Sequence, residues 1–367
     1  MLILLTLFFA SIVCQLIFFL AFGVASTRKQ NSKVEVIHQP VSVIVCAHDE
    51  EENLRALLPL LLAQNHPQFE VIIVDDRSND GTFDFLREEA EKDNRLRIVK
   101  VEHLPPHANG KKYGITLGIK AAHYDIILLT DADCRPVGNT WVQSMSSHFN
   151  EQTQFVLGFS PYQKKQGFLN LFIRYETLFT ALQYFSFAWL GYPYMGVGRN
   201  LAYRKSLFLQ NKGFNEYLGI TGGDDDLFVN RHATGSNAAV CTDPGAIVTS
   251  TPKQIWREFV QQKIRHLSVG KFYKFKHRFI FGLFTISHLL TWLLGGVLIY
   301  LLPDFWWVPV ALVLRVFTVA GTVHLFAKRV GHKFEAWTVP LLDFLFAIYY
   351  ISTGTVALVT KKVQWKS

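Results

Sequence analysis

Residues 126–134 read Ile-Ile-Leu-Leu-Thr-Asp-Ala-Asp-Cys, an apolar run that ends in two carboxylates separated by one residue. The run predicts a buried strand over 126–129, and alternate residues of an extended chain point the same way. Asp131 and Asp133 are therefore predicted to face one hard cation, Mg²⁺ or Mn²⁺, with positions left for water and phosphate. The alternative is a solvated loop, which the apolar strand before it disfavours.

This strand is the fourth in a series of short apolar runs that alternate with helical stretches. The other predicted strands are 41–46, 71–74 and 97–101, and the predicted helices are 50–62, 82–91 and 113–122. Such alternation predicts an α/β domain with a parallel sheet and right-handed crossovers. Ligands of these sheets bind at the carboxyl ends of the strands, which is where the polar residues of this chain gather.

A second acidic pair, Asp75 and Asp76, leaves the predicted strand 71–74 and is followed by Arg-Ser-Asn-Asp-Gly. Two carboxylates at the end of a buried strand are costly unless they are partnered. One could cap the next helix, and the other could accept hydrogen bonds from a ribose hydroxyl or a base N–H. The competing interpretation is an ordinary turn, because Asn-Asp and Asp-Gly sequences favour turns.

A third acidic motif reads Gly-Gly-Asp-Asp-Asp-Leu over residues 222–227. One interpretation is an N-terminal cap, since helix starts favour carboxylates. The other makes one acid a general base for an attacking hydroxyl, with its pKa raised by its neighbours.

A fourth motif, Gln-Lys-Ile-Arg-His at 262–266, lies in an amphipathic stretch over 254–275. Gln262 and Arg265 are three residues apart and share a helix face, where the arginine could help to hold a metal-bound diphosphate. The alternative is a basic helix lying on lipid, and the stretch fits both descriptions. The aromatic segment 168–190 predicts a further helix that either skims the bilayer or packs internally.

The composition indicates a membrane protein. The 367 residues are 50% apolar and 18% charged, with a mean hydropathy of +0.18, which excludes a disordered chain. The four cysteines are scattered, which excludes a small disulfide scaffold, and no C-x-x-C pair is present, which excludes a zinc knuckle or redox motif; a reducing compartment is favoured. The net charge is +8, and basic residues gather beside hydrophobic segments at 253–278 and 328–333. This pattern favours lipid headgroups over nucleic acid as the partner.

Residues 2–24 carry no charge and are long enough to cross a bilayer of ~30 Å. Basic residues follow at 28, 29 and 33, which predicts an uncleaved anchor with the next domain in the cytoplasm. A cleaved signal peptide is the alternative.

The last third of the chain contains the predicted spans 279–302 and 337–360 and a weaker one at 305–326. Arg315 and Asp343 interrupt two of them and are predicted either to pair between helices or to sit near an interface. Three spans would export the C-terminal lysines 361, 362 and 366, so one segment is a candidate for a re-entrant structure.

In this order the motifs resemble the membrane-bound, inverting family-2 glycosyltransferases with a GT-A fold, related to cellulose, chitin and hyaluronan synthases. The resemblance covers about residues 41–270. The matching segments are the opening strand and turn at 41–53 (with Asp49 in place of Asn), Asp75-Asp76, Gly110-Lys111 with Gly114 and Gly118, the D-x-D motif at Asp131 and Asp133, the Gly-rich strand 196–204, the acidic motif 223–227, and 262–266, which aligns with Q-x-x-R-W.

The resemblance implies a role for each matching residue. A nucleoside-diphosphate sugar, with UDP the commonest nucleotide of the family, would bind with its base and ribose near His48, Glu50, Asp75 and Asp76. Asp224 would be the catalytic base. Three groups would complete the substrate site: Lys111 near the phosphates, Asp226, and Gln262 with Arg265 on the diphosphate. The metal ligands would be Asp131 and Asp133.

The resemblance also implies an organisation: a transmembrane anchor at 1–26, a GT-A domain at 35–252, an amphipathic interfacial helix at 253–278, and a membrane region of two or three spans at 279–367. The expected protein is a hexosyltransferase of the bacterial inner membrane with a cytoplasmic catalytic domain.

Two departures separate the chain from the synthases. Gly223 replaces a Glu and His266 replaces a Trp, so we expect transfer of one or a few sugars to a lipid-linked or growing glycan acceptor. The same departures leave an inactive membrane scaffold or regulatory subunit as the alternative. A Rossmann dehydrogenase is excluded, because no G-x-G-x-x-G follows the first strand.

Overall fold

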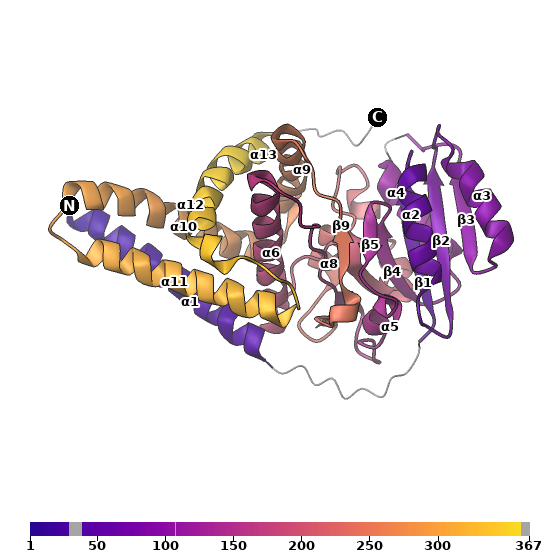
Figure 1. Ribbon diagram of the computed structural model, residues 1–367, viewed down its shortest axis with the longest axis horizontal. Helices are drawn as coiled ribbons and strands as arrows, with labels where there is room; N and C mark the ends of the chain where they lie inside the picture. Colours follow the sequence, from indigo (N-terminus) through magenta and orange to yellow (C-terminus); the bar gives the residue numbers. More distant parts are fainter. Residues whose placement is uncertain (29–38, 107, 361–367) are drawn as a thin grey trace. The chain divides into compact units, whose positions relative to one another are not determined.

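The computed structural model describes residues 1–28, 39–106 and 108–360, which form two compact units (Figure 1). Of the described residues, the α/β unit comprises 39–106, 108–164 and 188–252, and the helical unit comprises 1–28, 165–187 and 253–360. Lysines 29, 33, 361, 362 and 366, on which the predicted orientation depends, lie outside the described residues. The cytoplasmic orientation therefore stays a prediction.

The α/β unit is built on a seven-stranded sheet with the order β3-β2-β1-β4-β7-β6-β8. Its parallel half contains β1 (Val41–Ala47), β2 (Phe69–Asp76), β3 (Leu96–Val101) and β4 (Ile126–Asp131). The helices between these strands are α2 (Glu51–Leu62), α3 (Thr82–Lys92) and α4 (Gly110–Ala121). All four strands and all three helices predicted from the alternating pattern are confirmed.

The other half of the sheet corrects the prediction of a parallel sheet. β7 (Leu201–Arg204) runs antiparallel to both β4 and β6 (Phe155–Leu157), and β8 (Ala238–Val240) pairs with β6. A separate pair joins β5 (Cys134–Pro136) to β9 (Val248–Ser250). These strands have three or four residues each, too few for an alternating sequence pattern to reveal them.

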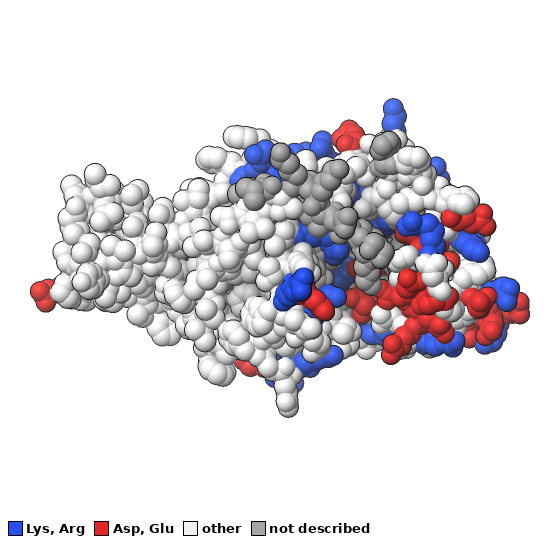
Figure 2. Space-filling view, turned by 90° about the horizontal axis from the view of Figure 1, so that it is seen from above, with Lys and Arg blue, Asp and Glu red and all other residues white. Residues whose placement is uncertain are grey.

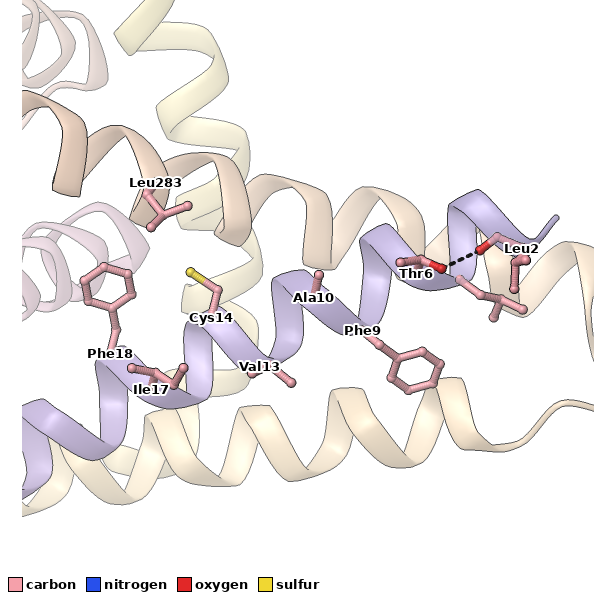
Figure 3. Close-up of a pocket in the computed structure, with 10 residues that line it drawn as sticks. Leu2, Thr6, Phe9, Ala10, Val13, Cys14, Ile17, Phe18 and Leu283 are labelled. Carbon is pink, nitrogen blue, oxygen red and sulfur yellow. Dashed lines mark hydrogen bonds between the residues drawn. The ribbon is translucent and has the colours of Figure 1, made fainter.

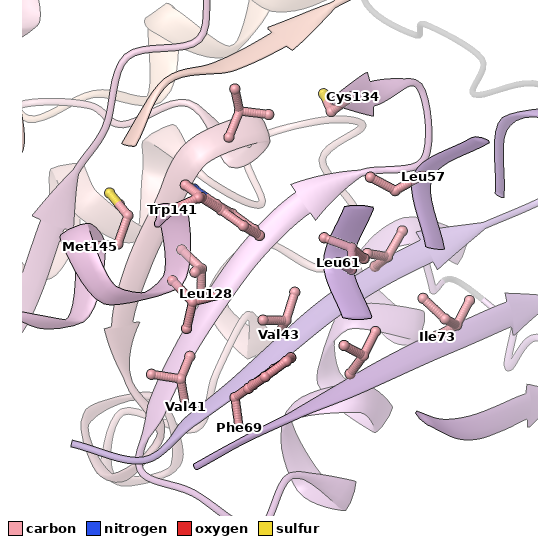
Figure 4. Close-up of a cluster of buried hydrophobic side chains, with 14 of the residues drawn as sticks. Val41, Val43, Leu57, Leu61, Phe69, Ile73, Leu128, Cys134, Trp141 and Met145 are labelled. Atoms are coloured by element: carbon pink, nitrogen blue, oxygen red, sulfur yellow. The ribbon is translucent and has the colours of Figure 1, made fainter. Parts of the chain in front are cut away.

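Short helices complete the α/β unit, and a large hydrophobic cluster lies on one face of its sheet. The helices are α5 (Trp141–Ser146), α7 (Lys205–Gln210), α8 (Asp226–His232) and the 3₁₀ turns η1 (Gly198–Asn200), η2 (Asn215–Tyr217) and η3 (Pro244–Ala246). Figure 4 shows Val43, Ile73 and Leu128 of three neighbouring strands packed with side chains of α2 and α5. The largest of these, Trp141, is fully buried, and its indole N–H donates to Asn200 Oδ1 over 3.0 Å.

Within the part of the chain that the structure describes, the helical unit contains four helices that are long and apolar enough to cross a membrane: α1 (Leu2–Thr27), α10 (Phe275–Leu301), α11 (Trp307–Arg329) and the segment Ala336–Ala357. The last is composite, with η5 (Ala336–Thr338), α12 (Val339–Tyr349), a π-helical turn η6 (Tyr350–Gly354) and α13 (Thr355–Val359). Large apolar side chains such as Phe317 (72% exposed) face outward, and Figure 2 shows few charges over these helices. Lipid is the environment that such a surface requires.

A groove along α1 illustrates this surface (Figure 3). Its volume is about 830 Å³, and it is lined by residues such as Phe9, Val13 and Ile17, with Leu283 of α10. The one hydroxyl drawn there, on Thr6, donates to the Leu2 carbonyl over 3.0 Å. The groove suits acyl chains rather than a nucleotide.

Two predicted boundaries differ from the structure. Helix α6 (Phe168–Trp189) falls within the predicted 35–252 domain, yet residues 165–187 pack in the helical unit, where the Phe179 and Phe346 rings lie 5.0 Å apart. Aromatic side chains all round the helix need partners on several sides, which favours internal packing over a helix that skims the bilayer. The predicted helix over 253–278 is divided: α9 (Trp256–Val269) is followed by the 3₁₀ turn η4 (Gly270–Phe272), and α10 then begins.

The predicted pairing of Arg315 with Asp343 is confirmed, and it joins helices α11 and α12. Both side chains are at most 1% exposed, and the guanidinium also donates to Gln15 Oε1 of α1 over 3.0 Å. Trp292 of α10 donates to Asp343 Oδ2 over 3.0 Å. One buried ion pair therefore connects all four candidate spans.

We predict that removing one partner of this pair destabilises the protein more than removing both. Asp343→Leu or Arg315→Leu alone leaves a buried, uncompensated charge and should cost about 3–5 kcal/mol, whereas the double variant should recover most of that loss. Thermal unfolding of the detergent-solubilised protein measures the difference. Additive losses in the double variant would mean that the two side chains are not coupled.

Candidate active site

The register of the parallel strands brings the predicted acidic residues to one edge of the sheet. Ala47 of β1 is paired with Asp75 of β2, and Cys46 is paired with Asp131 of β4. Because these three strands end together, the two acidic motifs flank the end of β1. The sequence-based expectation that they share the carboxyl edge is therefore confirmed.

Lys111 is the centre of this group of acids. It stands in the first turn of α4, and its Nζ lies 3.0 Å from Asp131 Oδ1 and 3.2 Å from Asp224 Oδ2. Burial alone would lower the pKa of Lys111, but Asp131 and Asp224 hold that pKa well above its ordinary value. The lysine therefore stays charged and joins a residue of the predicted metal site to the predicted base.

Asp133, the second acid of the D-x-D motif, is held by residues of the paired strands β5 and β9. Its Oδ2 accepts from Ser250 Oγ of β9 over 3.4 Å, and its Oδ1 contacts the Cys134 thiol over 3.6 Å. Burial and the nearby Asp131 raise the pKa of Asp133, while Arg199 opposes that rise. Two repelling carboxylates of this kind form a hard oxygen donor set, which fits Mg²⁺ or Mn²⁺.

The three acids of the loop 222–226 have different roles. Two of them fit the interpretation as a helix cap, and one fits the interpretation as a general base. Asp225 caps α8: its Oδ1 accepts from the Asp226 N–H over 2.7 Å, and its Oδ2 accepts from the Gly198 N–H over 2.6 Å. Burial, with Asp224 nearby, raises the pKa of Asp225 to about 6. Asp226 occupies the first position of α8 and accepts from the Leu227 N–H. Asp224 is the acid that faces Lys111.

The backbone conformation explains why glycines precede these acids. Gly222 and Gly223 have φ values of +81° and +78°, in the region that L side chains rarely adopt. A glutamate at 223, as the family pattern has it, would be strained in this loop. Gly223 is therefore a requirement of the local backbone, and its presence does not by itself argue against catalysis.

Lys112, which sequence reasoning did not single out, anchors the segment that leads into this loop. Its buried Nζ donates to the carbonyls of Tyr217 and Ile220, each over 2.6 Å. Burial lowers its pKa to about 8. Two consecutive residues of α4 thus hold the loop 222–226. Lys112 anchors the segment that precedes the loop, and Lys111 contacts Asp224, the first acid in it.

The predicted nucleotide-binding residues lie around the ends of β1 and β2. His48 Nδ1 donates to the Asp76 carbonyl over 2.6 Å, and Glu50 Oε2 accepts from Asn53 over 2.6 Å. The Asp76 carboxylate is held on both oxygens by Arg77, over 2.8 and 3.2 Å. Asp75 accepts from the Ser78 N–H over 3.3 Å, as an ordinary turn residue would. The structure is therefore compatible with both interpretations of Asp75 and Asp76, as nucleoside-binding residues and as residues of an ordinary turn.

Arg199 is a second residue that the sequence reasoning missed. It lies in η1 with its guanidinium 4.4 Å from the centre of the Tyr162 ring, and among the described residues its buried Nη1 has no hydrogen-bond partner. Burial would lower its pKa, but Tyr162, with smaller contributions from Cys134 and Asp133, keeps that pKa above the ordinary value. The sequence signal was the Gly-rich run 196–204, which showed the segment but not this side chain.

Gln262 and Arg265 lie on α9, which belongs to the helical unit, so their predicted contact with the diphosphate stays a prediction. Within that unit their neighbour Lys263 is buried and donates to Glu176 Oε2 of α6 over 2.5 Å. This ion pair fixes α9 against α6.

A mixed sheet with acidic motifs and a buried lysine at its strand ends is the arrangement expected of a GT-A-like α/β fold. The chain belongs to the family described as glycosyl transferase family group 2, whose model matches residues 126–323, more than half of the chain. The model of glycosyl transferase family 2 matches residues 42–209. The chain therefore belongs to a glycosyltransferase family, as the motifs predicted.

Individual relatives agree with this assignment. The probable glycosyltransferase YdaM of Bacillus subtilis is 26% identical over 260 residues, which are 66% of this chain and 60% of YdaM. The poly-beta-1,6-N-acetyl-D-glucosamine synthase of Staphylococcus epidermidis is 29% identical over 93 residues, which are 25% of this chain and 21% of the synthase. The chain thus spans less than two thirds of either relative.

Among solved structures, a mannosyltransferase from Pyrobaculum calidifontis, PcManGT, in complex with GDP-Man and Mn²⁺, matches with a TM-score of 0.63. The match covers 98% of this chain and 99% of that chain at 18% identity, so the two share a fold.

We predict that Lys111→Met lowers sugar transfer by at least about 100-fold, a loss comparable to that of a catalytic group. Without the ammonium, Asp131 and Asp224 repel each other, so both the metal site and the base are disturbed. Transfer of labelled sugar from its nucleotide measures the effect. Lys120→Met, at an exposed position of the same helix, is the control and should retain activity; equal losses in both variants would contradict the role of Lys111.

Proposed function

We propose that this glycosyltransferase transfers a sugar from a nucleoside-diphosphate sugar, with inversion and with a divalent cation, to a lipid-linked or growing glycan acceptor at the membrane. The observation that carries the proposal is the contact of one lysine, Lys111, with both Asp131 and Asp224. Lys111 thus links Asp131, which would hold the metal-bound diphosphate, to Asp224, which would accept the proton of the attacking hydroxyl.

The donor half of the site would be formed by Asp131, Asp133 and Lys111. Mg²⁺ or Mn²⁺ bound by the two carboxylates supplies charge neutralisation to the departing diphosphate. Lys111 adds a fixed positive charge beside them, and His48, Glu50, Asp75 and Asp76 would receive the nucleoside. The GDP-Man and Mn²⁺ bound to PcManGT, which shares the fold, support a donor and a cation of these classes.

The acceptor half would depend on Asp224. Asp225 and Asp226 are engaged by backbone N–H groups at the start of α8, so Asp224 is the acid of this loop that we assign as the base. It would take the proton of the acceptor hydroxyl as that oxygen attacks the anomeric carbon from the face opposite the diphosphate. A single displacement of this kind inverts the configuration. Gln262 and Arg265 would retain the diphosphate.

A membrane-bound acceptor is supported by the helical unit. Four helices are long and apolar enough to span a bilayer, and the α1 groove offers an apolar surface of the kind that acyl chains contact. We propose a cytoplasmic catalytic domain on a bacterial inner membrane, with one or a few sugars transferred to each acceptor. The positive φ of Gly223 weakens the alternative of an inactive scaffold, because a conformational requirement accounts for that departure.

We predict that Asp224→Asn lowers turnover by about 10²–10⁴-fold while the affinity for the donor changes little, since only the proton acceptor is lost. Asp133→Asn should instead raise the concentration of Mn²⁺ needed for activity, and a chelator should abolish activity reversibly. Asp84→Asn, at an exposed position of α3, is the control. Near-normal turnover of Asp224→Asn would overturn the assignment of the base.

The substrates are best found by incubating the purified protein with a panel of nucleotide sugars, membrane lipids and Mn²⁺. Mass spectrometry of the lipid fraction should show a product heavier by one or a few sugar residues. A product formed only on soluble glycans, or only free sugar released by hydrolysis, would contradict a lipid-linked acceptor.

A further inference from the structure

A second group of metal-ligating side chains lies in the α/β unit. One ring nitrogen of His148, the thiol of Cys241 and a carboxylate oxygen of Asp243 all lie within 4.8 Å of one another. The three come from two segments of the chain: His148 follows α5, while Cys241 and Asp243 lie in the loop between β8 and η3. Neither the proposed sugar transfer nor any motif singled out above uses them.

The three ligand types select the metal. A thiolate with an imidazole and a carboxylate is a donor set typical of Zn²⁺, whereas Mg²⁺ and Mn²⁺ prefer oxygen alone. Zinc lies ~2.0–2.3 Å from such ligands, which places tetrahedral donor atoms roughly 3.5 Å apart. Small side-chain movements from the observed separations would suffice. The D-x-D acids, in contrast, are an all-oxygen set, so the two sites would differ in the metal that they prefer.

The surroundings fit a zinc site as well. His148 Nδ1 contacts the Ser144 carbonyl of α5 over 2.9 Å, and because a carbonyl only accepts, Nδ1 is the protonated nitrogen. This leaves the lone pair on Nε2 and fixes the ring, as outer hydrogen bonds to zinc-bound histidines commonly do. Cys241 is buried at 1% exposure, while His148 and Asp243 are more accessible, so solvent can deliver an ion to a site with one buried ligand.

We propose that His148, Cys241 and Asp243 bind Zn²⁺ and thereby fasten η3 to the end of α5. The anchored turn already contributes to the frame of the active site. The carbonyl of its last residue, Ala246, accepts from Asn200 Nδ2 over 2.7 Å, and Asn200 is the neighbour of Arg199. The metal would act as a structural brace for this turn, and the proposal does not depend on the proposed sugar transfer.

The test measures zinc on the full chain in detergent. The protein is stripped with a chelator, returned to buffer with excess Mg²⁺ to occupy the D-x-D acids, and titrated with Zn²⁺ against a chromophoric chelator. We expect about one tightly bound zinc per chain and a higher melting temperature with zinc, since a ligand that binds only the folded state stabilises it. Cys241→Ser and His148→Gln should each weaken binding by at least about 100-fold, beyond what losing an outer partner costs.

Two controls separate this site from the others. Cys14→Ser, in α1, should bind zinc as the unmodified protein does, and so should Asp131→Asn. Co²⁺ provides a second readout, because a thiolate-to-cobalt charge-transfer band should appear in the unmodified protein and be absent from Cys241→Ser. Failure to bind zinc, binding that survives in Cys241→Ser, or binding lost only in Asp131→Asn would each overturn the proposal. If Cys241→Ser does not fold, the zinc titration and cobalt spectrum of His148→Gln decide the question.

Discussion

The structure of the α/β unit depends on keeping several carboxylates together at the ends of parallel strands. Like charges a few ångströms apart in a partly buried site repel strongly unless a cation lies among them. Lys111 supplies that cation within the chain, 3.0 Å from Asp131 and 3.2 Å from Asp224. Its position depends in turn on α4, which approaches the end of β2 closely because Gly110 has no side chain: a Cβ there would lie 2.6 Å from Asp76 Oδ2.

The helical unit also contains buried opposite charges, and there they lie among apolar helices. In hydrocarbon an unpaired charge is costlier than in water, so Arg315 and Asp343 are tolerated because each neutralises the other. Gln15 and Trp292 satisfy further hydrogen-bonding groups of the pair. Pairs of opposite charge thus stabilise both units. In the helical unit the pair joins helices, whereas in the α/β unit the charged side chains lie at the strand ends, where we propose that the substrate binds.

The sequence predicted the parts of the fold whose patterns are long. Strands β1 to β4 have six to eight residues and lead into recognisable helices or acidic motifs, so their type and order could be predicted. The antiparallel strands are too short, and α6 is apolar enough to fit either unit, so its packing with the membrane helices was not predicted. Arg315 and Asp343 could be paired beforehand because two isolated charges in apolar segments have few other partners.

The active site was predicted to a similar extent. Asp131 and Asp133 were recognisable from motif spacing, and Asp224 was assigned from the family resemblance. The register confirms that Asp75 and Asp131 share one edge of the sheet. The spacing could not show that Lys111 contacts acids from two motifs or that Lys112 anchors the loop. These depend on contacts between segments about 100 residues apart, which no local pattern encodes.

The most direct test of the central claim is a double-variant cycle on kcat/KM with Lys111→Met, Asp224→Asn and their combination. If the lysine and the aspartate act as one unit, the double variant will be about as slow as the slower single variant, because either change already removes the shared function. If instead the two losses multiply, Lys111 and Asp224 act independently, and the arrangement at the strand ends does not have the role assigned to it.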